Sequence, residues 1–489
     1  MKLSGILEKV EYTLLQGNAD IEISDIVYDS RKATKNTLFV CMVGAVVDGH
    51  EYISKALDNG ASAIVVEREV EELPEHVTVV KVESTREALA FMSAAFFGYP
   101  AEELTTIGIT GTKGKTTTTY MLKSVLEQTG EKVGIIGTIG ITIGDRFIHA
   151  KNTTPESYEI HKTFREMVDA GCKYAVMEVS SQGLKLARVA GILFDFGVFT
   201  NLSADHIGPA EHESFEEYRY CKSLLFRQCK VGIVNADDEN TENILCGHTC
   251  EVKKFSINAP ADFSAKNITL WSSDGELGVK FDTTAASEMN VVVRTPGLFS
   301  VYNAMVAVSV ASLAGIPDAC IKEGLHKASV KGRVELVPAS KDFTVIIDYA
   351  HNDLSTRSVL NTLLEYKPKR LICLFGCGGN RSKLRRYDMG EIAGALADLC
   401  VITSDNPRDE ELHEINEDIK IGLNRSNANY IEIDDRKEAI RYCVQNAQKG
   451  DMIVLLGKGH QTYEEIRGVK YHFDEREVVA EIRKELQLQ

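Results

Sequence analysis

A glycine-rich segment at residues 110–117 carries the residue types that bind phosphate. It lies between a predicted strand and a predicted helix and reads Thr110-Gly111-Thr112-Lys113-Gly114-Lys115-Thr116-Thr117. Its glycines allow backbone angles that turn successive amide N–H groups toward one anion, and the following helix offers its positive end to that anion. The lysine and threonine that end such a loop reach the terminal phosphates and a Mg²⁺ ion. The segment therefore predicts a nucleotide-binding loop, although it is shorter than the usual pattern.

Two more polar residues follow apolar, strand-like runs. Glu178 lies at the end of the run 174–179, and His206 comes shortly after the run 196–200. Ligands of α/β proteins bind at the carboxyl ends of parallel strands, and a carboxylate there suits a hard cation such as Mg²⁺. Glu178 is thus a candidate metal ligand. By residue type alone, His206 and Lys222 indicate nothing more than polar surface positions.

The elements around these residues predict an α/β fold. A strand at 106–110, a helix at 116–128 and a strand at 132–136 form a β–loop–α–β unit, which implies a parallel sheet covered by helices. Short alternating runs between residues 257 and 293 predict antiparallel strands. Near the C-terminus, helix-like stretches alternate with strand-like runs, which predicts a doubly wound sheet; these runs are 344–347, 370–375, 399–403 and 452–456.

Two breaks divide the chain of 489 residues. Gly98-Tyr99-Pro100 ends an amphipathic, helix-like stretch, because proline disfavours helix at the preceding residue. A second break lies near Gly332. At roughly 100–200 residues per domain, we predict three domains, at residues 1–98, 99–331 and 332–489.

Composition excludes several kinds of partner. Charged residues make up 26% of the chain and its net charge is −16, without a long basic tract. Nucleic acids and anionic membranes require a broad cationic face, so neither is expected as a partner. No run reaches the ~18 apolar residues of a membrane span, and no signal peptide is visible. We expect a cytoplasmic protein without membrane insertion, which the scattered cysteines also fit.

Further motifs follow in a fixed order along the chain. They include Thr153-Thr154-Pro155-Glu156, Glu178-Val179-Ser180-Ser181, Asn201-Leu202-Ser203-Ala204-Asp205-His206, Asp348-Tyr349-Ala350-His351 and Asp405-Asn406-Pro407-Arg408. In this order they resemble the Mur ligases of bacterial cell-wall synthesis. The resemblance implies an N-terminal domain for a UDP-linked substrate, a central ATP-binding domain with a parallel sheet and a Rossmann-like C-terminal domain for an amino acid. It also implies an ATP-dependent enzyme that acts as a monomer.

The implied reaction belongs to peptidoglycan precursor synthesis. ATP phosphorylates a carboxylate of UDP-N-acetylmuramoyl-L-alanyl-D-glutamate to an acyl phosphate, and the amine of a diamino acid then displaces phosphate. The resemblance assigns catalytic roles to Lys115, Lys222, Glu178 and His206. It also implies that four residues bind Mg²⁺, namely Thr116, Glu178, His206 and Lys222, the last as a carbamate formed with CO₂.

The same resemblance assigns the binding residues. The expected ATP contacts are Gly111, Thr112, Lys113, Gly114, Lys115, Thr116, Thr117, Asn303, Arg333 and Asp348. Those for the UDP-linked substrate are Ser30, Thr153, Thr154, Ser180 and Arg188. Those for the amino acid are Arg381, Asp405, Asn406, Pro407, Arg408, Gly457 and Gln461.

Charge suggests which amino acid is added. meso-Diaminopimelate carries a second carboxylate at its far end and L-lysine does not, and Arg408 offers a planar, permanently charged fork to such a group. Gln461, however, stands where many diaminopimelate-adding members have glutamate, and parts of the chain look closer to lysine-adding members. We therefore favour meso-diaminopimelate and keep L-lysine as the alternative.

Two other classes of protein share some of these features. A ligase similar to folylpolyglutamate synthetase would have the loop and the general plan, but it would lack a UDP-binding domain such as the first 97 residues predict. A nucleotide-binding regulator without activity would have no need of the retained Lys115, Glu178, His206 and Lys222. Both are less favoured interpretations.

Overall fold

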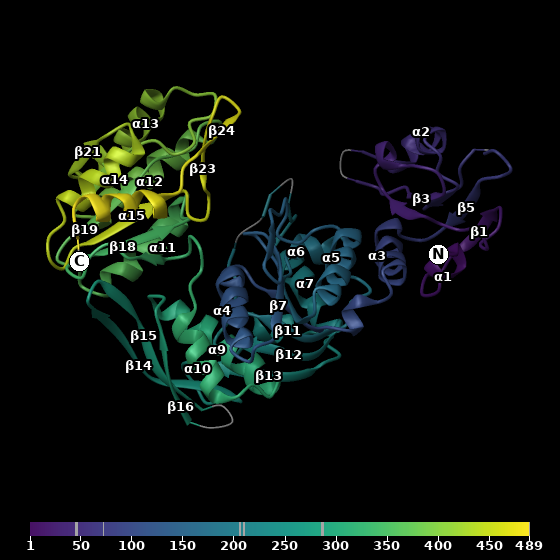
Figure 1. Cartoon of the computed structure of the whole chain (residues 1–489), viewed down its shortest axis with the longest axis horizontal. Coiled ribbons are helices and arrows are strands. Elements are labelled where there is room, and N and C mark those ends of the chain that lie inside the picture. Colours follow the sequence, from purple (N-terminus) through teal and green to yellow (C-terminus); the bar gives the residue numbers. More distant parts are fainter. Residues whose placement is uncertain (45–46, 72, 205–206, 209–210, 285–287, 489) are drawn as a thin grey trace. The chain divides into compact units, whose positions relative to one another are not determined.

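The structure, a computed structural model, describes residues 1–489 except 45–46, 72, 205–206, 209–210, 285–287 and 489. It contains two compact units, Met1–Ser256 and Ile257–Gln489 (Figure 1). Each unit combines helices with parallel strands, so the predicted α/β fold class is confirmed. The predicted domain boundaries at residues 98 and 331 stay a prediction.

The first unit begins with a five-stranded sheet of order β1-β5-β4-β3-β2. Its strands are β1 (Thr13–Gln16), β2 (Asp25–Val27), β3 (Thr37–Val40), β4 (Ala63–Val66) and β5 (Thr78–Lys81). Only β1 among them runs antiparallel, against β5. Helix α3 (Thr85–Phe96) buries Leu89 and Met92 with the apolar side chains of the sheet, and Ser84 caps the start of the helix. The short helices α1 (Leu3–Ile6) and α2 (Ile53–Asp58) complete this part.

The second sheet of this unit has the order β13-β12-β11-β6-β10-β7-β8-β9. Its strands are β6 (Thr105–Thr110), β7 (Lys132–Ile136), β8 (Ile141–Ile143), β9 (Arg146–Ile148), β10 (Cys172–Glu178), β11 (Phe194–Phe199), β12 (Cys229–Asn235) and β13 (Glu251–Ser256). The strands from β13 to β7 run parallel, and β8 and β9 are antiparallel additions. The parallel strands bring the ends of β6, β7, β10 and β11 to one edge.

Helices connect these strands, as parallel order requires. They are α4 (Lys115–Glu127), α5 (Ser157–Asp169), α6 (Ser181–Lys185), α7 (Phe215–Ser223) and α8 (Thr241–Ile244). The predicted β–loop–α–β unit is present as β6, α4 and β7, and β7 has the bounds expected from the sequence. Figure 1 shows α4, α5 and α7 beside the strands β7 and β11.

The second unit begins with three antiparallel strands, β14 (Phe263–Ser273), β15 (Glu276–Thr284) and β16 (Glu288–Val293). They confirm the antiparallel strands expected between residues 257 and 293. Helix α9 (Leu298–Leu313) packs against these strands, and α10 (Asp318–Lys327) packs against β16.

A six-stranded sheet of order β17-β18-β22-β19-β20-β21 forms the rest of the second unit. Its strands are β17 (Glu335–Val337), β18 (Thr344–Asp348), β19 (Leu371–Phe375), β20 (Leu399–Ile402), β21 (Tyr430–Glu432) and β22 (Met452–Leu456). Only β17 of this sheet is antiparallel. A separate hairpin is made of β23 (Tyr463–Ile466) and β24 (Val469–His472).

Two distinct apolar clusters lie against this six-stranded sheet. One includes residues of α11 (Asp353–Leu364), α12 (Lys383–Leu396) and α13 (Leu412–Arg425). The other includes residues of α14 (Arg436–Gln445) and α15 (Glu475–Glu485). Helices therefore cover both faces, as predicted for a doubly wound sheet. Across the described residues, no helix is long and apolar enough to cross a membrane.

Candidate active site

The phosphate loop connects β6 to α4 in the conformation that its glycines predict. Gly111 and Gly114 have φ values of 146° and 88°. A Cβ atom at Gly111 would collide with Oγ1 of Thr200, which follows the neighbouring strand β11. Lys115 begins α4, and its Nζ donates to the carbonyl oxygens of Gly111 at 2.8 Å and Thr112 at 3.1 Å. The lysine ammonium therefore lies over the loop, beside the positive end of the helix.

Glu178 links the phosphate loop to the carboxyl ends of the neighbouring strands β10 and β7. The residue ends β10 and is 1% exposed. Its Oε2 accepts from the hydroxyls of Thr116 and Thr138, each at 3.0 Å, and its Oε1 accepts from the backbone N–H of Thr138 at 2.9 Å. Sequence analysis missed Thr138. Its place just after the apolar run 132–136, at the carboxyl end of a parallel strand, is the signal that could have identified it.

Lys222 is buried against the loop, so its interpretation by residue type as a surface lysine is wrong. It is 1% exposed, and its Nζ donates to the carbonyl oxygen of Gly111 at 2.9 Å. The ammonium also lies 4.5 Å from the ring centre of Tyr218, whose hydroxyl is 3.1 Å from Oγ1 of Thr112. Lys222 lies in the last turn of α7.

The segment after β11 also contacts the loop. The Asn201 side chain accepts from the backbone N–H of Lys113 and donates to its carbonyl oxygen, both at 3.0 Å. His206, a predicted metal ligand, lies outside the described residues.

Four of the five residues predicted for the UDP-linked substrate lie together at this sheet edge. The Thr154 hydroxyl donates to the Glu178 carbonyl oxygen at 3.0 Å and accepts from the Ser180 N–H at 2.9 Å. Nη1 of Arg188 donates to the Thr154 carbonyl oxygen at 3.0 Å. The Thr153 hydroxyl is 3.0 Å from that of Thr138. Ser30, the fifth, lies in the part of the unit that holds the five-stranded sheet.

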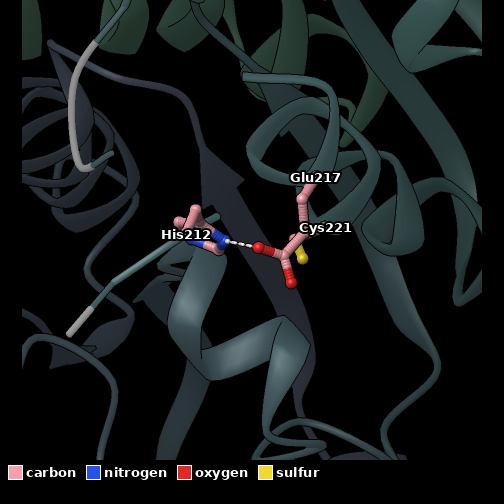
Figure 2. Close-up of side chains that lie close together, drawn as sticks. All are labelled: His212, Glu217 and Cys221. Atoms are coloured by element: carbon pink, nitrogen blue, oxygen red, sulfur yellow. Dashed lines mark ion pairs between the residues drawn. The ribbon is translucent and has the colours of Figure 1, made fainter. Parts of the chain in front are cut away.

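A polar cluster joins α6 to α7, and Figure 2 shows three of its side chains, those of His212, Glu217 and Cys221. His212 precedes α7, and its Nδ1 is 3.6 Å from Oε2 of Glu217, one helical turn before Cys221. Its Nε2 is 2.8 Å from the hydroxyl of Ser181, at the start of α6. Burial lowers the pKa of His212, which keeps the ring neutral at neutral pH. Lys185 of α6 pairs with Glu217 at 2.6 Å, so the cluster fixes the helix that carries Lys222.

The second unit contains a cavity of about 300 Å³. Six of the seven residues predicted to bind the amino acid line it: Arg381, Asp405, Asn406, Arg408, Gly457 and Gln461. Pro407 lies in the same loop as Asp405, Asn406 and Arg408. Sequence analysis missed other lining residues, among them Cys377, Ser382, Arg385, Arg386 and Met389. Cys377 follows β19, and the other four lie in or just before α12, close in sequence to the predicted Arg381.

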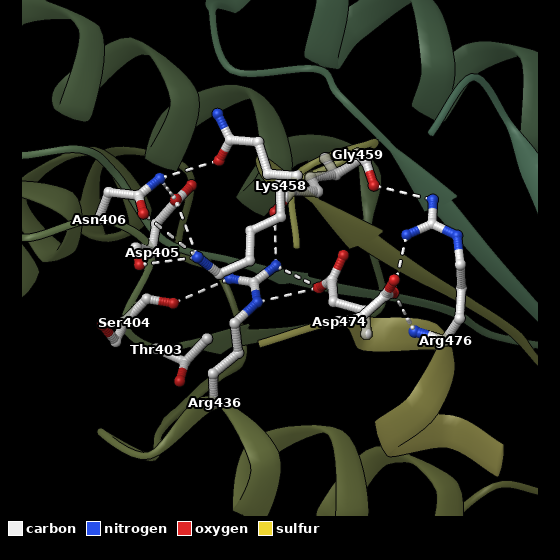
Figure 3. Close-up of polar contacts among 12 residues, drawn as sticks. Thr403, Ser404, Asp405, Asn406, Arg436, Lys458, Gly459, Asp474 and Arg476 are labelled. Atoms are coloured by element: carbon white, nitrogen blue, oxygen red, sulfur yellow. Dashed lines mark hydrogen bonds and ion pairs between the residues drawn. The ribbon is translucent and has the colours of Figure 1, made fainter. Parts of the chain in front are cut away.

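Buried cations hold the cavity loop in place (Figure 3). Lys458 is fully buried, and its Nζ donates to the carbonyl oxygens of Asp405 at 3.0 Å and Tyr463 at 2.9 Å. Burial lowers the pKa of Lys458, and nearby Asp405 opposes that shift. The Arg436 guanidinium donates to the carbonyl oxygens of Ser404 at 2.9 Å and Leu456 at 2.8 Å. Ser404 and Leu456 directly precede the cavity residues Asp405 and Gly457.

Arg408 and Gln461 already have partners within the chain. Nε of Arg408 donates to Oε2 of Glu465 at 3.3 Å, and Nη1 donates to the Gly379 carbonyl oxygen at 2.7 Å. The side-chain oxygen Oε1 of Gln461 accepts from Nδ2 of Asn406 at 3.0 Å. A far ammonium of the substrate would therefore share this oxygen with Asn406.

The remaining predicted ATP contacts belong to the second unit. Asn303 is buried in α9, and the Arg333 guanidinium lies 5.2 Å from the ring centre of Tyr349. The Asp348 carboxylate accepts from the N–H groups of Val334 and Ala350, both at 2.7 Å, and burial raises its pKa. Their contact with ATP stays a prediction.

Comparison with known proteins identifies the family. Residues 22–97 match the Mur ligase family, catalytic domain; residues 109–311 match the Mur ligase middle domain; and residues 332–459 match the Mur ligase, glutamate ligase domain. The chain belongs to the Mur ligase family. The predicted enzyme class, a ligase, is thereby confirmed.

The similar proteins extend along the whole chain. A UDP-N-acetylmuramoyl-L-alanyl-D-glutamate–2,6-diaminopimelate ligase of Caldanaerobacter subterraneus subsp. tengcongensis is 46% identical over 484 residues, covering 99% of both chains. A protein of Clostridium acetobutylicum with the same name and the number 1 is 44% identical over 490 residues, covering 99% of this chain and 100% of its own. A solved structure of a ligase with this name has 26% identity and a TM-score of 0.74, with 100% of both chains covered.

A folylpolyglutamate synthase of Thermotoga maritima shares the fold only in part. Its solved structure has 19% identity and a TM-score of 0.58, and it covers 76% of this chain and 90% of its own. The folylpolyglutamate-synthetase alternative is therefore not favoured.

Proposed function

We propose that this Mur-family ligase joins meso-diaminopimelate to UDP-N-acetylmuramoyl-L-alanyl-D-glutamate in peptidoglycan precursor synthesis. The observation that supports the amino acid best is the cavity of about 300 Å³, which combines the cations Arg381 and Arg408 with the acceptors Asp405 and Asn406. A far end with both a carboxylate and an ammonium has complementary partners there. The names of the full-length relatives describe the same reaction.

The loop and Glu178 supply the surroundings for phosphoryl transfer. The terminal phosphate of ATP passes to the substrate carboxylate, which gives an acyl phosphate and ADP. The amine then attacks the acyl carbon, an amide forms, and phosphate leaves as the amine loses a proton. Phosphoryl transfer depends mainly on positioning and on stabilising charge, and we assign both to the loop amides and to Lys115. Lys115 would exchange its contact with the loop carbonyls for the phosphates.

The donor chemistry around Glu178 fits Mg²⁺, which would neutralise phosphate charge when bound. Thr116, Thr138 and Glu178 offer only oxygen atoms, the ligands that hard cations prefer. We assign Thr116 and Glu178 to this ion, and we assign His206 to a second Mg²⁺.

We also assign Lys222 to the metal, as a carbamate. Its ammonium would first lose one proton, and the resulting amine would then form a C–N bond to CO₂ and lose a second proton, which replaces a cation by an anion. The burial of Lys222 beside the phosphate loop supports this role, because a carbamate there would offer Mg²⁺ the oxygen ligand that this ion prefers.

The other assignments follow the family. Asn303, Arg333 and Asp348 complete the ATP site, and Ser30, Thr153, Thr154, Ser180 and Arg188 bind the UDP-linked substrate. We further propose that the enzyme acts as a cytoplasmic monomer with domains at residues 1–98, 99–331 and 332–489.

Competition between the two amino acids tests this function. The purified chain is given ATP, Mg²⁺, the UDP-linked dipeptide and equal amounts of meso-diaminopimelate and L-lysine, and products are separated by mass. We expect phosphate release only when dipeptide and amino acid are both present, and a product dominated by diaminopimelate. A product dominated by L-lysine would overturn the amino-acid assignment alone. Phosphate release without a ligated product would overturn the reaction.

A further inference from the structure

We infer that Glu465 is a positioning residue for Arg408 and thereby favours amino acids that carry a second carboxylate. The inference rests on the proposed function, because it concerns how the cavity recognises the far end of diaminopimelate. Glu465 lies on β23 and is not among the residues that line the cavity within the described structure. The Glu465 side chain pairs with the cavity residue Arg408, so we expect the effect of this side chain on the substrate to pass through Arg408.

The backbone of the hairpin fixes the backbone of Arg408. The Arg408 N–H donates to the Glu465 carbonyl oxygen at 3.0 Å, and the Arg467 N–H donates to the Arg408 carbonyl oxygen at 2.8 Å. Arg408 thereby forms a parallel bridge with Ile466. Its φ is 51°, in the left-handed region that a non-glycine residue rarely adopts. The hairpin therefore holds Arg408 in a conformation that the loop alone would disfavour.

The side chain of Arg408 is held at two points. Glu465 accepts from Nε at 3.3 Å, and the Gly379 carbonyl oxygen accepts from Nη1 at 2.7 Å. A Cβ atom at Gly378 would lie 2.9 Å from Nη1, so the glycine lets the guanidinium approach this closely. The two contacts use two of the five N–H groups of a guanidinium. The other three remain available to a carboxylate in the cavity that Arg408 lines.

Fixing the guanidinium before the substrate binds reduces the entropy lost on binding. Arginine has a long side chain, and an interface gains affinity when such a side chain is already ordered. Diaminopimelate benefits because its far carboxylate meets Arg408. L-Lysine has no such carboxylate, so it gains nothing. Glu465 is thus expected to act on the choice of amino acid rather than on phosphoryl transfer.

The test measures KM and kcat for diaminopimelate in full-length Glu465→Ala and Glu465→Gln. Ordering one long side chain changes affinity by about 2- to 12-fold, so Glu465→Ala should raise KM by that factor while kcat and the KM of ATP stay unchanged. Glu465→Gln keeps an oxygen that can accept from Nε, and it should restore KM to near the parent value. Equal damage by alanine and glutamine would overturn the role of this hydrogen bond.

A double-mutant comparison shows whether the effect passes through Arg408. In an Arg408→Ala background, Glu465→Ala should change KM no further, because the group that it positions is gone. An equal further rise in KM would overturn the inference and would indicate a general role in the hairpin.

Glu411→Ala provides the matched control. Glu411 pairs with Arg467 at 2.9 Å and is 71% exposed, so its loss removes another ion pair between the hairpin and the segment after Arg408. We expect the parent KM in this variant, and a rise like that of Glu465→Ala would overturn the inference. A parent enzyme without any diaminopimelate product would instead refute the proposed function, which this inference requires.

Discussion

The two candidate binding regions are built in different ways. The phosphate loop is one run of residues, 110–117. Its partner Glu178 ends one parallel strand, and its partner Thr138 lies just after the neighbouring one. The amino-acid cavity collects residues from separate segments around Tyr349, Arg381, Asp405 and Gly457. A site in one run is determined by local conformation. A site from several segments also requires side chains that hold those segments together.

The cations of the two regions differ in their partners. In the loop region, Lys115 and Lys222 both donate to the carbonyl oxygen of Gly111. In the second unit, Arg386 pairs with Asp418 at 2.9 Å and Arg436 pairs with Glu475 at 2.7 Å. A carbonyl oxygen is a weaker partner for a cation than a carboxylate. We therefore expect the buried arginines to stay in place when substrates bind.

Removing Lys115 should give the largest effect. Lys115→Ala takes a cation from the phosphate site, and comparable cations in phosphoryl transfer contribute about 10³-fold or more to kcat. Ligation should therefore fall to background while the thermal midpoint stays near that of the parent. Lys123→Ala, which removes a lysine paired with Glu127 on the same helix, is the control and should remain active. Near-normal turnover of Lys115→Ala would contradict the assignment of the loop.

Lys222→Ala should be nearly as harmful, and it tests the carbamate. If the carbamate supplies an oxygen to the metal, loss of Lys222 should lower kcat by about 10²-fold or more. A short carboxylate such as acetate should then restore part of the activity, because it supplies the missing oxyanion. Since Lys222 is buried, thermal melting must accompany the kinetics. A folded, inactive variant without rescue, together with an unmodified lysine in a metal-bound crystal structure of the parent, would contradict the carbamate.

The buried ion pair in the second unit should control stability. Arg436 and Glu475 are 1% and 0% exposed, and breaking such a pair costs about 3–5 kcal/mol. Glu475→Gln should lower the free energy of unfolding by that amount in denaturant titration. Glu481→Gln is the control, since Glu481 pairs with Lys437 between the same two helices at the surface, where a pair contributes about 0–1 kcal/mol. Equal losses in the free energy of unfolding for the two variants would show that burial does not determine how much each ion pair contributes.

The local conformation of the contiguous loop could be predicted from the sequence almost completely. Strands β7 and β22 have the predicted bounds. The loop glycines have positive φ values, which are backbone angles of the kind that the sequence analysis expected of them. Hydrophobic patterns and a glycine-rich motif are local properties, so the sequence displays them directly. The family resemblance then added residues, such as Arg408, that no local pattern distinguishes from other charged surface residues.

The supporting residues could not be predicted in the same way. Lys222 and Glu465 look like ordinary surface residues, because their partners Gly111 and Arg408 are distant in sequence. Such contacts arise only when parallel strands or a hairpin bring separate segments together. Thr138 is an intermediate case, since its place after a strand is visible but its bonds to Glu178 are not.

Arg408→Ala should give the smallest of these effects and the most selective one. A hydrogen bond to a charged group contributes about 1.5–3 kcal/mol, which corresponds to about 10- to 150-fold in kcat/KM. Diaminopimelate should lose this factor because its far carboxylate loses the guanidinium. L-Lysine should lose little, and it can even gain, since its ammonium no longer faces a cation while Glu465 loses its partner.

Both amino acids should be measured with the parent, with Arg408→Ala and with Arg467→Ala. Arg467 is 75% exposed and follows Ile466 on the same hairpin, so its loss removes an arginine of the same chemistry without touching the cavity. The ratio of kcat/KM for meso-diaminopimelate to kcat/KM for L-lysine should fall only in Arg408→Ala. An equal loss for both amino acids would mean that Arg408 supports the shape of the cavity. In that case another cation that lines the cavity would have to bind the far carboxylate of meso-diaminopimelate, and Arg381 and Arg385 are the candidates.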